Sequence, residues 1–89
     1  MAGERYMFHL VIASVGETQF DGPVLSATLP GADGELTILP HHEPLVTTLK
    51  PGTITVRLSG EGGVLGEPKT FPVASGVLEV SGNRAVVLL

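Results

Sequence analysis

A short loop bounded by two prolines holds most of the chain's side chains with reactive chemistry. Pro40 and Pro44 enclose two adjacent histidines and a glutamate, His41, His42 and Glu43. Imidazole and carboxylate groups are the side chains that metal sites and acid–base catalysis commonly use. The loop is therefore the first place to look for a function.

A metal site would use His41, His42 and Glu43, with His9 as a fourth ligand. Adjacent side chains on an extended backbone point in opposite directions, so the two loop histidines cannot easily share one ion. The ligand spacing also matches no standard zinc pattern. We therefore disfavour a metal site, and we predict no cofactor.

Catalysis would pair His42 with Glu35 or Glu43 as acid and base. A hydrolase also needs a nucleophile and an oxyanion hole, and the sequence contains no Gly-x-Ser-x-Gly elbow. The stretch 30–35 lacks the lysine and the following helix of a phosphate-binding loop, so it is interpreted as a tight turn. We predict that the chain is not an enzyme. A small hydrolase or metal protein using these loop residues is the third-ranked hypothesis.

The remaining functional interpretation of the loop is a docking surface. A proline at each end restricts the backbone, so the loop loses less entropy when a partner binds. The two histidines and the carboxylate suit a polar partner. A solvated loop without a role is the alternative, and physical reasoning favours neither interpretation clearly.

The elements around this loop are predicted to be short β-strands. The 89 residues include 12 glycines and 7 prolines that separate β-branched segments, a pattern typical of an all-β sandwich or barrel. No segment shows a sustained helical period. We predict one domain over residues 1–89, an antiparallel two-sheet β-sandwich of about eight to ten short strands. The predicted strands span Tyr6–Ser14, Thr18–Asp21, Val24–Leu29, Glu35–Leu39, Leu45–Leu49, Thr53–Ser59, Lys69–Ala74, Val77–Val80 and Arg84–Leu89.

Several local features of these strands are also predicted. Phe8, Leu10 and Ile12 alternate onto one face of the first strand. The pair at 22–23, Gly-Pro, is expected to break the second strand, because proline cannot donate to a ladder. Glycines at both ends of the turn over 30–34 suit positive φ angles. Residues 60–63 are expected to form a hairpin tip.

Charge and composition exclude several classes of partner. The net charge is −4 with only five Lys and Arg, so the chain has no basic stripe for nucleic acid. Cysteine is absent, which removes disulfides and thiolate chemistry. No apolar run approaches the roughly 20 residues that span a bilayer, and the N-terminus lacks a signal-peptide profile.

The stretch 34–52 reads GELTILPHHEPLVTTLKPG. It resembles a long motif of the F-type ATP synthase epsilon subunit, in that family's N-terminal β-sandwich domain. Flanking blocks agree in order along nearly the whole chain: residues 8–14 resemble the opening strand, 20–22 the family's Phe-x-Gly, and 73–80 its Gly-x-Leu-Glu-Val segment. A motif of this length is far more specific than a short signature.

The resemblance implies a non-catalytic rotor subunit of the central stalk. Such a subunit docks on the gamma subunit and on the membrane c-ring, and it helps to couple ion translocation to ATP synthesis. The resemblance places the ring contact on Glu35 and His42, and gamma contacts on Ser14, His42 and Thr47. It also implies a peripheral place on the cytoplasmic face of the bacterial inner membrane, through the complex. The alternative function is a free-standing β-sandwich module that binds a peptide or small ligand.

This chain departs from the family pattern at several positions. His41 stands where the family usually has glycine, Glu43 where it usually has alanine, and Thr37 where glycine is common. Residues 60–69 suggest a longer hairpin than the family's. The family normally continues into a C-terminal helical hairpin that in many members binds ATP or inhibits hydrolysis. We expect no helical C-terminal domain and no ATP binding in this chain.

Overall fold

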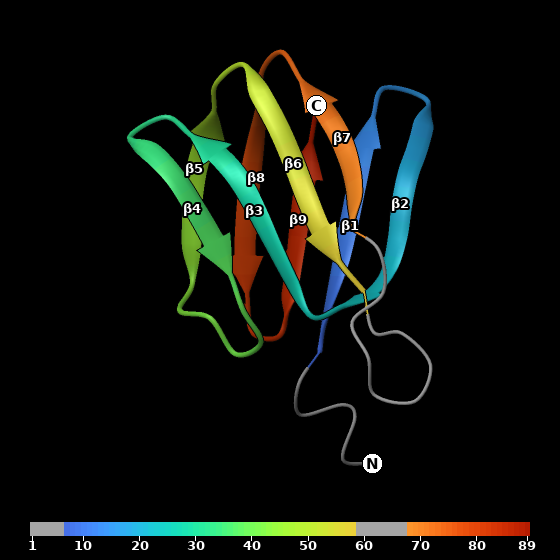
Figure 1. Cartoon of the computed structure of the whole chain (residues 1–89), viewed down its shortest axis with the longest axis vertical. Coiled ribbons are helices and arrows are strands. Elements are labelled where there is room, and N and C mark those ends of the chain that lie inside the picture. The colour runs from blue at the N-terminus through green and yellow to red at the C-terminus, as the bar shows by residue number, and fades with distance from the viewer. Residues whose placement is uncertain (1–6, 59–67) are drawn as a thin grey trace.

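The computed structural model describes residues 7–58 and 68–89 and folds them into nine β-strands (Figure 1). These residues contain no helix, and hence no helix long and apolar enough to cross a membrane. The predicted hairpin tip at 60–63 lies outside the described residues. The strands are β1 (Phe8–Ser14), β2 (Glu17–Val24), β3 (Ser26–Gly31), β4 (Gly34–Ile38), β5 (Leu45–Leu49), β6 (Gly52–Arg57), β7 (Lys69–Val73), β8 (Gly76–Ser81) and β9 (Arg84–Leu88).

The strands form two packed layers, so the prediction of an all-β sandwich is confirmed. One layer has the order β2-β1-β9-β8-β5, and the other has the order β4-β3-β6-β7, in front of it in Figure 1. The layers join through a single pairing of Gly31 in β3 with Leu49 in β5, which makes all nine strands one continuous curled sheet. Most pairs are antiparallel as predicted, but β1 and β9 pair in parallel.

Alternation of apolar residues along the strands builds the core between the layers. Phe8, Leu10 and Ile12 share one face of β1 as predicted, because successive side chains of a strand face opposite sides, and that face is buried. The other layer contributes Leu29, Ile54 and Val56, each fully buried. The remaining core residues are also apolar. They are Val24, Ala27, Ile38, Leu49, Val73, Leu78, Val80, Ala85 and Val87.

Two local predictions were wrong for identifiable reasons. β2 runs through Gly22 and Pro23 to Val24, because it lies at the edge of its layer and pairs only with β1. An edge strand tolerates a residue that has no N–H to donate. Gly31 is a strand residue without a positive φ angle, whereas Gly34 has a φ of 134° as predicted.

Gly31 is glycine because the place where the layers join has no room for a side chain. A Cβ atom there would lie 2.5 Å from Leu36 Cδ2 and 2.7 Å from the Gly34 carbonyl oxygen. Neighbouring backbone bonds tighten the same corner: the Lys50 N–H donates to the Pro30 carbonyl at 2.9 Å. The close approach of Leu36 and Gly34 to this position, and not a turn conformation, explains why residue 31 is a glycine.

The chain reversals gather at two ends of the sandwich. The upper end in Figure 1 holds the turns at 15–16, 32–33, 50–51 and 74–75. The lower end holds the β4–β5 loop, residues 39–44, and the β8–β9 turn at 82–83. The proline-bounded loop of the sequence therefore lies at the lower end.

Candidate functional site

The β4–β5 loop has a defined geometry. The His41 N–H donates to Asn83 Oδ1 in the β8–β9 turn at 2.8 Å. His42 is half-buried, and its ring Nδ1 lies 2.7 Å from the Glu43 carbonyl oxygen. Because a carbonyl only accepts, that ring nitrogen carries the proton in this contact. The backbone at His41 and the side chain of His42 are thus held by hydrogen bonds within the domain.

The loop histidines do not meet the partners that metal or acid–base chemistry requires. His42 bonds to a backbone carbonyl, not to the carboxylate of Glu35 or Glu43. His9 lies on β1, where its Nε2 atom is 2.5 Å from Asp21 Oδ1 on β2. Within residues 7–58 and 68–89, no group of three His, Asp or Glu side chains is placed to hold a metal ion. Among the residues that the structure describes, the loop histidines therefore do not form the metal site or the acid–base pair considered from the sequence.

Glu35 and His42, the two residues that the resemblance assigned to the ring, lie far apart. Glu35 is exposed at the start of β4, beside the turn at 32–33 of the upper end. His42 lies beyond the other end of β4, in the lower-end loop. The strand alone separates Glu35 from Ile38 by about 10 Å at 3.3 Å per residue. The two residues therefore lie toward opposite ends of β4.

The predicted gamma contacts also lie apart, although two of them share a layer. Ser14 ends β1 at the upper end and accepts a 3.4 Å hydrogen bond from Gln19 Nε2. Thr47 is in the middle of β5, half-buried, with its hydroxyl donating to the Thr48 carbonyl. Strands β9 and β8 lie between β1 and β5, which amounts to about 14 Å at the usual strand spacing. Ser14 and Thr47 thus belong to the five-stranded layer, and His42 belongs to the loop at the lower end.

The outer face of that layer carries an apolar stripe that sequence reasoning did not identify. Val46 is 68% exposed, Leu88 57% and Val77 40%. The ladder places Val77 opposite Leu88, and Leu88 opposite Ala13, so these side chains are neighbours across three strands. The sequence signal was the apolar residues at both alternating positions of β5, β8 and β9, which are typical of a strand covered on two faces. Val46 on β5 lies opposite Glu79 and is diagonal to Val77 on the same exposed face. We name the set Ala13, Val46, Val77 and Leu88 the outer stripe.

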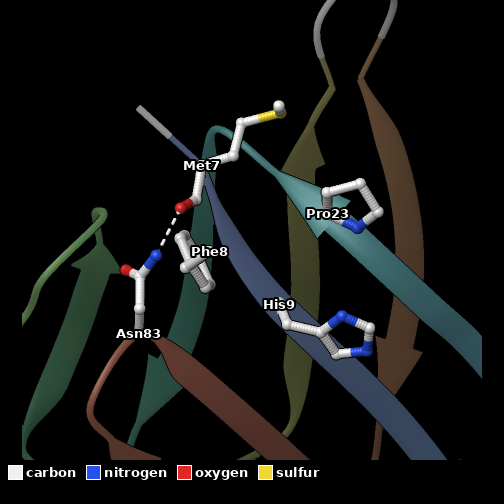
Figure 2. A pocket seen from close by; sticks show the side chains of 5 residues that line it. All are labelled: Met7, Phe8, His9, Pro23 and Asn83. Atoms are coloured by element: carbon white, nitrogen blue, oxygen red, sulfur yellow. Dashed lines mark hydrogen bonds between the residues drawn. The ribbon is translucent and has the colours of Figure 1, made fainter. Parts of the chain in front are cut away.

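A shallow pocket of about 210 Å³ opens beside the lower end (Figure 2). Met7, Phe8, His9 and Pro23 line it together with Asn83. Figure 2 shows the Asn83 side chain reaching the main chain of Met7, to whose carbonyl it donates at 2.6 Å. Sequence patterns did not identify Asn83 as a candidate site residue. Its position two residues from Ser81, after a glycine, gave no sign of its contacts with other segments.

Fold and geometry define a small β-sandwich domain whose candidate site is a docking loop at one end. A family model described as the beta-sandwich domain of the ATP synthase delta/epsilon chain matches residues 7–89. The chain belongs to this family, which confirms the resemblance found in the sequence.

Curated relatives agree with the family match. The chain is 38% identical over 80 residues to the ATP synthase epsilon chain of Delftia acidovorans, and 40% identical over 80 residues to that of Bordetella avium. Each alignment covers 90% of this chain, and 54% and 53% of the two relatives. The chain thus spans about half the length of the curated relatives it matches.

Solved structures share the fold. A chain in the Euglena gracilis mitochondrial ATP synthase (OSCP/F1/c-ring) superposes with a TM-score of 0.80 at 24% identity, covering 93% of this chain and 50% of that one. A chain in the central stalk/c-ring structure of the Tetrahymena thermophila mitochondrial ATP synthase gives 0.70 at 16% identity, covering 90% and 60%. At these identities the likeness supports the sandwich fold alone.

Proposed function

We propose that this chain is a non-catalytic central-stalk subunit of an F-type ATP synthase, docking on the gamma subunit and on the membrane c-ring to couple ion translocation to ATP synthesis. The observation that carries this proposal is the family match over residues 7–89. The names of the bacterial relatives support the same role. In this role residues 1–89 act as one domain, peripheral to the cytoplasmic face of the inner membrane through the complex.

The two partners are assigned to different parts of the sandwich. Glu35, exposed beside the upper-end turn at 32–33, is assigned to the c-ring. Ser14, His42 and Thr47 are assigned to gamma. His42 is assigned to the ring as well, at the other end of β4 from Glu35.

The outer stripe gives gamma an apolar surface to cover. Ala13 precedes Ser14 on β1, and Val46 precedes Thr47 on β5, so the stripe and two of the assigned contacts lie on the same strands, although they face opposite sides of the layer. An apolar patch exposed on a sheet face commonly marks a protein interface. Burying such side chains supplies the free energy of association, while the polar contacts at the margin give orientation.

The test is binding of the full chain to purified gamma subunit from the same source, by calorimetry. Wild type should bind at micromolar concentration or tighter. Val46→Asp should lower the affinity about tenfold or more, because gamma would bury an unpaired carboxylate. Thr70→Asp, on the exposed face of β7 in the other layer, is the matched control and should bind like wild type.

Absence of gamma binding by the wild-type chain would overturn the rotor proposal. It would favour the alternative of a free-standing β-sandwich module for a peptide or small ligand. Equal losses in Val46→Asp and Thr70→Asp would retain the partner but remove the outer stripe from the interface.

A further inference from the structure

Asn83 joins three segments that are distant in the sequence. Its side-chain oxygen accepts from the His41 N–H at 2.8 Å, and its amide nitrogen donates to the Met7 carbonyl at 2.6 Å. Its own carbonyl accepts from the His9 N–H at 3.0 Å. The start of β1, the β8–β9 turn and the β4–β5 loop are thus tied together through one residue at the lower end.

The bond to the loop falls on a residue in an unusual conformation. His41 has a φ of 61° and is the one non-glycine residue with positive φ among those that the structure describes. A side chain in the left-handed region crowds its own backbone, so an isolated chain avoids it. The strain and one hydrogen bond are of comparable size. Without the Asn83 acceptor, His41 would return to negative φ and turn the following residues.

We propose that Asn83 is a positioning residue for docking: it holds His41 left-handed and so sets the direction in which the β4–β5 loop presents His42. The inference rests on the proposed function, because it takes gamma as the partner of His42. Asn83 itself lies in the turn beside the loop and acts through His41. His41 and His42 are consecutive residues, so the backbone conformation of His41 directly sets the direction of His42.

The hold on the loop is testable without any partner. Amide hydrogen exchange of the full chain should show the His41 amide protected, and Asn83→Ala should speed its exchange about tenfold or more. Ser81→Ala, an exposed residue of the same β8–β9 hairpin, is the control and should leave that rate unchanged. Rapid exchange of the His41 amide in the wild-type chain would overturn the proposal.

The effect on docking is measured by calorimetry with purified gamma subunit. Asn83→Ala should weaken binding about five- to tenfold, the equivalent of one lost hydrogen bond. Measurements are made below the unfolding temperature of every variant, so that a loss of fold does not count as a loss of affinity.

A rescue separates positioning from general stability. Glycine adopts the left-handed conformation without steric cost, so His41→Gly combined with Asn83→Ala should return the affinity to within about twofold of His41→Gly alone. A merely structural role for Asn83 would leave the double variant as weak as Asn83→Ala, and that result would overturn the proposal.

The two proposals fail in different ways. If the wild-type chain binds no gamma, the rotor function fails, while the exchange experiment still decides whether Asn83 holds His41. If gamma binds the wild type and Asn83→Ala equally well, the function stands and the positioning role is wrong.

Discussion

At the residue scale, His41 carries a conformation that its side chain disfavours. Its φ of 61° is one that glycine adopts freely, and the sequence resemblance places a glycine at this position. The substitution of histidine introduces strain that the hydrogen bond to Asn83 offsets. Histidine in place of glycine at position 41 therefore changes the backbone energetics as well as the size and polarity of the side chain.

His41→Gly should raise the free energy of unfolding by about 0.5–1 kcal/mol. Relief of left-handed strain favours the variant by about 1–2 kcal/mol, and the greater freedom of glycine in the unfolded chain removes part of that gain. Urea denaturation measures the difference. His42→Gly is the control, because His42 has no positive φ and should lose stability instead. A destabilised His41→Gly would contradict the left-handed assignment.

At the element scale, contacts between strands of different layers determine how the sandwich closes. On one side, Gly31 in β3 meets Leu49 in β5 and joins the layers by hydrogen bonding. On the other side, Phe20 from β2 packs edge-to-face on Phe71 from β7, with ring centroids 6.0 Å apart. One side is thus joined through the backbone and the other through aromatic side chains.

Gly31→Ala should lower the free energy of unfolding by about 1–3 kcal/mol, the usual cost of overpacking. The new methyl group would meet Leu36 Cδ2 at 2.5 Å and the Gly34 carbonyl at 2.7 Å, and the backbone atom cannot rotate away. Gly22→Ala is the matched control on β2, where the nearest atom lies at 3.8 Å. Equal stability of the two variants in urea denaturation would show that the corner has room.

At the scale of the whole molecule, residues of the proposed contacts lie at both ends of the sandwich. Glu35 lies at the upper end, and His42 lies at the lower end. The fully apolar core between the layers, which includes Leu10, Ile54 and Leu78, makes the body stiff, because protein interiors are close-packed. A stiff body suits the proposed role of a stalk subunit that contacts two partners.

Glu35→Lys should reduce ATP-driven proton pumping in membranes and leave gamma affinity within about twofold of wild type. The charge reversal falls on the proposed ring contact, away from the outer stripe, and effects at distant sites are usually independent. Thr37→Lys is the control, since it adds a lysine on the same face of β4 about 7 Å further from the turn. Unchanged pumping by Glu35→Lys would remove Glu35 from the ring contact.

The sequence predicted the strands well, because alternation is a local property. Leu45–Leu49 was predicted with its observed bounds, and most other strands differ by one or two residues. Pairing is not local, so the parallel contact of β1 with β9 and the passage of β2 through Pro23 were not foreseen. The first depends on which strands from the two ends of the described chain meet, and the second on β2 lying at an edge.

The candidate site was predicted in part. The loop at 39–44 was identified from its prolines and histidines, and the family resemblance supplied Glu35 and Thr47. Asn83 was missed, because its contacts reach 42 residues back to His41 and 76 back to Met7. The separation of Glu35 from His42 follows from the direction of β4, which local patterns do not contain.

The parallel pairing of β1 with β9 has a consequence for how the domain is made. The first and last strands that the structure describes lie side by side in the middle of one layer, with His9 opposite Arg84 and Ala13 opposite Leu88. During synthesis, β1 leaves the ribosome long before β9, one of its two neighbours in the layer, has been made. Contacts of such sequence separation also slow folding, because a long loop must close first. We therefore expect the domain to fold late and all at once, after β9 has emerged.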